Sequence, residues 1–266
     1  MAGYAELPRV RTWYDERGVG EPLALLHGGS VDSRFFDKNI GRLTERFHVF
    51  TPERRGHGHT PDVEGPITYD LMAEDTVEFL EAVVGGPAHL VGHSDGAVVS
   101  LLVALHRPDL LRRLVLISGV FHLDGWVPGA NQLDVDEVVK FVGSSYGEVS
   151  PDGEEHFRVV TEKIAQMALR EPTLTAAQLT GVNSRTLVMV GDDDLTTLEH
   201  TVALYRGIPN SMLAVVPGTS HFLIQEKPAL CNAIIVDFLT NDPASTVAPI
   251  RRAGTINQHR EGKSLP

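Results

Sequence analysis

A serine stands between two glycines where an apolar run of the sequence gives way to a helix-like one. The segment is GHSDG at 92–96, preceded by AHLV and followed by AVVSLLVA. A sharp strand-to-helix turn needs small residues two positions either side of its centre, and it lifts the central side chain clear of the sheet. Ser94 is therefore a candidate nucleophile, with the start of a helix directed at the reacting carbonyl oxygen.

A serine hydroxyl needs a base to become a nucleophile, and the base needs an acid to orient it. Downstream, the strand-like run SRTLVMVG is followed by Asp192, Asp193 and Asp194, and the run SMLAVVPG leads to His221. Loops that follow strands carry catalytic groups in sheets of this kind. The order serine, acid, histidine is the acyl-hydrolase order. His221 is predicted to be the base, and one of the three aspartates the acid.

Two adjacent glycines follow the strand-like run PLALL, in the segment HGGS at 27–30. Glycine lets a backbone N–H approach a ligand without obstruction by a side chain. The N–H groups of Gly29 and Asp95 are therefore predicted to form an oxyanion hole.

Other residues with chemical potential are given structural interpretations. The spacing of His57, His59 and Asp62 matches that of metal ligands in metallohydrolases, but no further ladder of His and Asp residues accompanies it, so we expect no metal site. His93 is predicted to pack beneath the turn, because successive side chains at a strand end point to opposite faces. The single cysteine, Cys231, is predicted to be a small buried residue.

Apolar runs alternate with helix-like segments, which is typical of a mostly parallel sheet with helices on both faces. The interval from 121 to 184 lacks strand-like runs and contains helical stretches at 134–146, 154–169 and 175–182. Because a structureless loop of that length is uncommon, we expect a helical cap at 121–184. The core then comprises 1–120 and 185–242, and the polar segment 243–266 is a tail.

Composition narrows the class of protein further. The chain has 266 residues, is 42% hydrophobic and carries a net charge of −12, without a long basic block. The length and hydrophobic content are typical of one sizeable core. The negative net charge argues against binding to nucleic acid or to an anionic membrane. The amino-terminal residues lack the apolar segment of a signal peptide, and no segment has the ~18 continuous apolar residues of a membrane span. A cytoplasmic protein is expected.

With these segments in place, the chain resembles the α/β-hydrolase family over about residues 8 to 241. The segments that carry the resemblance are HGGS at 27–30, RRGHGHT at 54–60, GHSDG at 92–96, GDDD at 191–194 and GTSH at 218–221. The family's acid usually stands three residues after the strand-end glycine, which selects Asp194. The resemblance implies a Ser94–Asp194–His221 triad, an oxyanion hole from Gly29 and Asp95, a cap over the site and no cofactor.

The expected activity is hydrolysis of a small-molecule carboxylic ester or lactone through an acyl-enzyme. A carbon–carbon bond hydrolase, a cofactor-free perhydrolase and a non-catalytic ligand receptor on the same fold remain alternatives, and a homo-oligomer is left open. The Asp95 carboxylate has two interpretations: a charge that stabilises the start of a helix, or, by resemblance to hydrolases of amino-acid esters, a group that binds a substrate ammonium.

Overall fold

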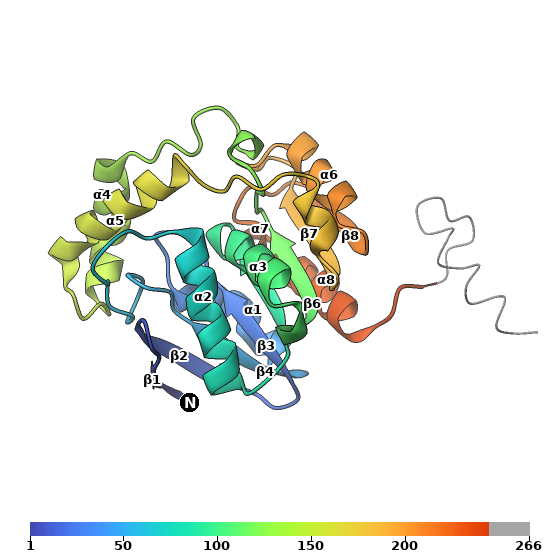
Figure 1. The fold of residues 1–266 in the computed structure, drawn as a ribbon, viewed down its shortest axis with the longest axis horizontal. Helices are drawn as coiled ribbons and strands as arrows, with labels where there is room; N and C mark the ends of the chain where they lie inside the picture. The colour runs from blue at the N-terminus through green and yellow to red at the C-terminus, as the bar shows by residue number, and fades with distance from the viewer. Residues whose placement is uncertain (245–266) are drawn as a thin grey trace, which may run out of the picture.

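One eight-stranded sheet organises the protein, and the computed structural model describes residues 1–244 of the chain. The predicted tail at 243–266 thus lies almost wholly outside the described residues. The strand order is β1-β2-β4-β3-β5-β6-β7-β8 (Figure 1). The strands are β1 (Ala2–Glu6), β2 (Arg11–Arg17), β3 (Glu21–Leu26), β4 (Phe47–Pro52), β5 (Ala88–His93), β6 (Leu111–Ile117), β7 (Arg185–Gly191) and β8 (Ser211–Val216). From β4 to β8 all neighbouring strands pair in parallel, whereas β2 pairs antiparallel with both β1 and β4.

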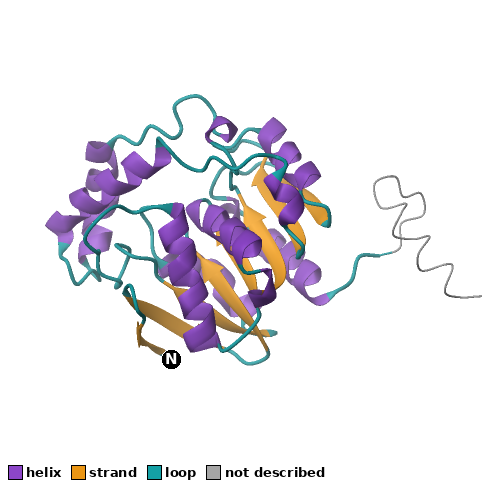
Figure 2. Ribbon diagram, in the orientation of Figure 1, coloured by secondary structure: helices purple, strands orange, loops and turns teal. Residues whose placement is uncertain are grey.

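Helices cover both faces of this sheet (Figure 2). They are α1 (Asp37–Leu43), α2 (Tyr69–Phe79), α3 (Asp95–His106), α4 (Val135–Gly147), α5 (Phe157–Ala168), α6 (Leu198–Gly207), α7 (Leu223–Glu226) and α8 (Pro228–Thr240). Side chains of β3 alternate between two buried clusters: Ala24 and Leu26 pack with α2 and α3, while Leu23 and Leu25 pack with α1 and α8. Burial on both faces explains why the central strands are continuous apolar runs. The predicted α/β architecture is confirmed.

The segment between β6 and β7 leaves the sheet and carries α4 and α5, which pack on each other beyond one end of the strands (Figure 1). Its third predicted helical stretch, at 175–182, is only a short 3₁₀ turn at Gln178–Gly181. The division into a core and a cap at 121–184 stays a prediction. No helix among residues 1–244 is long and apolar enough to cross a membrane.

Three contacts with carboxylates join this inserted segment to the loops beside the sheet. Arg34 Nη1 donates to Glu148 Oε2 at 2.9 Å, just beyond the end of α4. Lys163 Nζ on α5 donates to Asp62 Oδ2 at 2.7 Å, and His156 Nε2 lies 2.9 Å from the same oxygen. These contacts fix α4 and α5 relative to the loops that follow β3 and β4.

Candidate active site

Ser94 occupies the turn between β5 and α3 in a strained conformation, with φ 54° and ψ −119°. A non-glycine residue with positive φ costs of order 1–3 kcal/mol and persists only where its surroundings impose it. Here a Cβ added at Gly92 would collide with the carbonyl oxygen of Gly96, and one added at Gly96 would collide with that of Leu26. The two glycines therefore allow the contact of strand and helix that forces the turn.

His221 joins the serine to an aspartate. Its Nε2 lies 3.0 Å from Ser94 Oγ, and its Nδ1 lies 2.7 Å from Asp194 Oδ1. The three side chains come from loops after β5, β7 and β8, which lie at the carboxyl ends of parallel strands. The structure thus brings together the three residues that the sequence predicted as nucleophile, base and acid.

The Asp194 carboxylate is held by more than the histidine. Its Oδ2 accepts hydrogen bonds from Ser118 Oγ at 2.6 Å and from the Gly191 N–H at 3.2 Å, and its Oδ1 accepts one from the Thr196 N–H at 3.1 Å. Burial raises the pKa of Asp194, but the hydrogen bonds from His221, Ser118 and Thr196 outweigh it and bring the pKa to about 2. The carboxylate is therefore ionised at neutral pH and can stabilise an imidazolium.

The two neighbouring aspartates point elsewhere. Asp192 is exposed, and its Oδ1 accepts a hydrogen bond from the Thr219 N–H at 3.0 Å. The Asp193 side chain is also exposed, and its backbone N–H donates to Thr219 O at 3.1 Å. Asp192 thus braces the loop that carries His221, while only Asp194 contacts the imidazole.

The segment after β3 lies against the nucleophile turn. A Cβ added at Gly28 would lie 3.3 Å from Ser94 Cβ, and one added at Gly29 would collide with Asp95 Oδ2. Tyr69 Oη donates to Asp95 Oδ1 at 2.6 Å, so one oxygen of that buried carboxylate is occupied. Burial, followed by the Asp95 charge, raises the pKa of Tyr69 well above its ordinary value, which keeps this phenol a donor.

His93 is buried beside the turn that holds Ser94, and it contacts the backbone of His221. Its ring stacks on Phe35 at 4.6 Å between centroids, and its Nε2 lies 2.8 Å from the His221 carbonyl oxygen. Burial, followed by repulsion from His221, lowers the pKa of His93 to about 3. A neutral His93 therefore donates to the backbone of His221.

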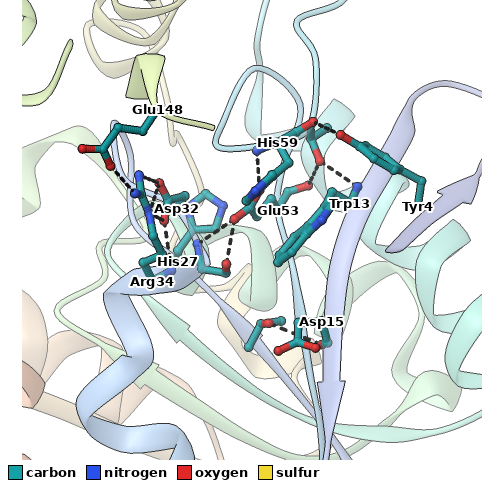
Figure 3. A network of polar contacts seen from close by, with 12 residues as sticks. Tyr4, Trp13, Asp15, His27, Asp32, Arg34, Glu53, His59 and Glu148 are labelled. Carbon is teal, nitrogen blue, oxygen red and sulfur yellow. Dashed lines mark hydrogen bonds and ion pairs between the residues drawn. The ribbon is translucent and has the colours of Figure 1, made fainter. Parts of the chain in front are cut away.

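The RRGHGHT segment contributes support to this site. His59 stacks on Trp13 at 4.2 Å between centroids, and its Nδ1 lies 3.0 Å from Glu53 Oε2 (Figure 3). Glu53, fully buried, also accepts a hydrogen bond from Ser33 Oγ at 2.7 Å. This carboxylate therefore ties the loop after β4 to the loop after β3.

The residues whose spacing matches that of metal ligands, His57, His59 and Asp62, each contact a different partner. The buried ring of His57 places Nδ1 2.9 Å from Arg55 O, His59 contacts Glu53, and Asp62 pairs with Lys163. Among residues 1–244, no group of three or more His, Cys, Asp or Glu side chains is arranged to hold a metal ion. Cys231 is fully buried, and burial raises the pKa of its thiol to about 11.

Ser118, Tyr69 and Arg54 are three residues around the site to which the sequence assigned no role. Ser118 could have been noticed as a small polar residue directly after the buried strand β6. Arg54 begins the RRGHGHT segment, but neither that segment nor the surroundings of Tyr69 in sequence indicate the contacts with Gly28 and Asp95, which join distant parts of the chain.

Known hydrolases are similar to this chain over most of their length. The chain is 23% identical over 250 residues to (E)-2-((N-methylformamido)methylene)succinate hydrolase of Acinetobacter baylyi. The aligned region covers 86% of this chain and 94% of that protein. The solved structure of the enol-lactonase from Burkholderia xenovorans matches with a TM-score of 0.74 at 20% identity, covering 90% of this chain and 100% of that one. The solved structure of the meta-cleavage product hydrolase from Pseudomonas fluorescens matches with a TM-score of 0.72 at 19% identity, covering 89% of this chain and 96% of that one.

These structural similarities establish the fold, and the sequence establishes the family. The model of the alpha/beta hydrolase family matches residues 23–234, which include the nucleophile turn, the aspartate loop and the histidine loop. The chain belongs to the alpha/beta hydrolase family.

Proposed function

We propose that the protein is a serine hydrolase that cleaves a carboxylic ester or lactone through an acyl-enzyme on Ser94. The observation that carries the proposal is the continuous chain of contacts from Ser94 Oγ through His221 to Asp194, at 3.0 and 2.7 Å. Such a chain serves nucleophilic catalysis, because the histidine can remove the serine proton while the carboxylate stabilises the resulting imidazolium.

The reaction proceeds in two halves. His221 Nε2 takes the hydroxyl proton as Ser94 Oγ attacks the carbonyl carbon, and the N–H groups of Gly29 and Asp95 stabilise the negative oxygen. Collapse of this intermediate breaks the ester C–O bond, and the leaving alcohol takes the proton from His221. A water, deprotonated by the same histidine, then releases the acid. In a lactone the alcohol and the acid belong to one product.

Carbon–carbon bond hydrolysis is the second candidate, and it is favoured by the structural similarity to the meta-cleavage product hydrolase. The two reactions differ in the group that leaves the carbonyl carbon of the substrate. An alkoxide takes the proton on oxygen and leaves as an alcohol, whereas a carbanion must be protonated on carbon. A panel of acyl esters, lactones, an amide and a vinylogous diketone, assayed under the same conditions, separates these activities.

Replacement of Ser94 tests the proposal. In Ser94→Ala, kcat should fall by about 10³-fold or more, because only binding and the oxyanion hole remain, and labelling by a fluorophosphonate probe should disappear. Ser220→Ala is the matched control, since this serine precedes His221 but its hydroxyl bonds to Glu226 at 2.6 Å. Retention of more than about a tenth of the turnover in Ser94→Ala would contradict the assignment. Absence of both label and turnover in the wild type would instead favour a ligand receptor.

A further inference from the structure

Arg54, two residues after the end of β4, is buried against the HGGS segment that follows β3. It is 4% exposed. Its Nη2 donates to Gly28 O at 2.7 Å and lies 3.1 Å from His27 Nδ1. The described residues offer no hydrogen-bond partner to its Nε. A guanidinium so deeply buried is costly unless it serves a specific contact, and the shortest contact here is to the Gly28 carbonyl.

The bond to Gly28 determines where the next N–H points. The Gly28–Gly29 peptide is trans and planar, so its C=O and N–H point in opposite directions. With the carbonyl directed at Arg54, the Gly29 N–H must point away from the guanidinium. Gly28 itself packs against Ser94, since an added Cβ would lie 3.3 Å from the serine Cβ. His27 Nδ1 also lies 2.8 Å from the Gly28 carbonyl oxygen, so Arg54 supplies the charged one of its two partners. Without the charged bond the glycine pair would be held less firmly, because glycine has few steric restrictions.

Arg54 carries its charge despite its burial, because a guanidinium stays protonated in proteins. Burial lowers the pKa of Arg54, and the negative charge of Asp95 is the strongest influence that raises it. Asp95 in turn is anchored by the Tyr69 hydroxyl at 2.6 Å. A charged donor forms a hydrogen bond roughly twice as strong as a neutral one, so the Gly28 carbonyl is held firmly.

We propose that Arg54 is a positioning residue of the oxyanion hole, which acts by holding the Gly28 carbonyl and thereby directing the Gly29 N–H at the negative oxygen. This inference rests on the proposed function. It predicts that loss of Arg54 impairs the transition state and leaves binding of the intact ester largely unchanged.

The test compares steady-state kinetics with binding of a trifluoromethyl ketone, whose adduct with a serine carries a negative oxygen. In Arg54→Met, kcat should fall by about 10²-fold, as for loss of one oxyanion donor, while KM changes by less than about threefold. The inhibition constant of the ketone should rise by the same factor as kcat falls. Arg54→Lys, which keeps a charged donor, should recover at least about a tenth of the wild-type kcat.

Arg55 supplies a matched control, because it is the adjacent buried arginine but forms a two-bond pair with Asp75, at 2.7 Å for each bond. Arg55→Met should lower the melting temperature while kcat of the folded protein stays within about threefold of the wild type. An equal loss of kcat in both variants would mean that any buried arginine matters, and it would overturn the inference.

Arg54→Met alone leaves the buried Asp95 carboxylate without the positive charge of Arg54, and this imbalance could unfold the protein. The double variant Arg54→Met/Asp95→Asn removes both charges. Its kcat should remain about 10²-fold below that of Asp95→Asn alone, because the Gly28 carbonyl still lacks its charged donor and keeps only His27 beside it. Recovery to the level of Asp95→Asn would show that Arg54 is only a counterion. Unchanged kinetics in folded Arg54→Met, with an active wild type, refutes the inference alone, whereas an inactive wild type refutes the proposed function.

Discussion

At the scale of single residues, the three aspartates in the loop after β7 have identical side chains but point in different directions, and only one of them reaches His221. Asp194 lies 2.7 Å from the His221 Nδ1, whereas Asp192 accepts from the Thr219 backbone and Asp193 is exposed. An acid acts on the base only through direct contact, so neighbours in sequence cannot replace one another.

We therefore expect Asp194→Asn to reduce kcat by about 10³- to 10⁴-fold, because an amide can stabilise the wrong tautomer of His221 and carries no charge. Asp192→Asn and Asp193→Asn should each change kcat by less than about tenfold, and they serve as controls of the same chemistry. Steady-state kinetics of the three purified variants decides the matter. Equal losses in all three would assign the loop a purely structural role.

Sequence motifs located the three side chains that the structure brings into contact, because the motif spacing indicates a local turn. Ser94 was identified by its two glycines, whose size the strand–helix contact demands. Arg54, in the RRGHGHT segment, and Tyr69 were assigned no role, since nothing near them in sequence indicates the Gly28 carbonyl or the Asp95 carboxylate that they contact. A motif therefore indicates the local turn in which a residue lies. Its contacts with a distant segment become visible only in the folded structure.

At the scale of elements, the central strands were predictable because burial on both faces leaves an unbroken apolar run. The edge strand β1 (Ala2–Glu6) was not, because its side chains are exposed or half-buried and it is held by antiparallel pairing with β2. Helix α1 (Asp37–Leu43) was also missed. It buries only Asn39, Ile40 and Leu43, too few for a periodic pattern to be detected.

The contact between β5 and α3 yields a prediction about stability. Gly96→Ala should lower the free energy of unfolding by about 2 kcal/mol or more, because the new methyl group collides with the Leu26 carbonyl oxygen, which is backbone. Gly41→Ala in the exposed middle of α1 meets no atom within 4 Å and should stabilise the protein by about 0.5–1 kcal/mol. Urea denaturation measures both. A Gly96→Ala protein as stable as Gly41→Ala would contradict the proposed packing.

At the scale of the whole molecule, several buried histidines make stability depend on pH. Burial lowers the pKa of His57 and of His93 to about 3, and that of His200 to about 4. In the unfolded chain the same groups titrate near their ordinary value of about 6.5, so between pH 6.5 and 4 the unfolded state binds more protons. The folded state is then disfavoured as pH falls, and the full contribution of these histidines is present only above pH 6.5.

We expect the free energy of unfolding to be constant above about pH 7 and to fall between pH 6.5 and 4, by up to about 4 kcal/mol per pH unit for the three histidines together. Urea denaturation at several pH values measures this slope. His57→Gln should reduce it by about 1.4 kcal/mol per pH unit, and replacement of the exposed His106 by Gln should not. A slope that is the same in His57→Gln and in the wild type would contradict the buried neutral histidine.

The contact between Ser94 and His221 spans 127 positions of the chain. All of α4, α5 and β7 lies within that span, so the contact closes a long loop, and its entropy must be overcome before the contact forms. Helix contacts within α3, by contrast, join neighbouring residues and close no long loop. We therefore expect a refolding or newly synthesised molecule to stay inert toward substrate until β8 has joined the sheet and brought His221 to Ser94.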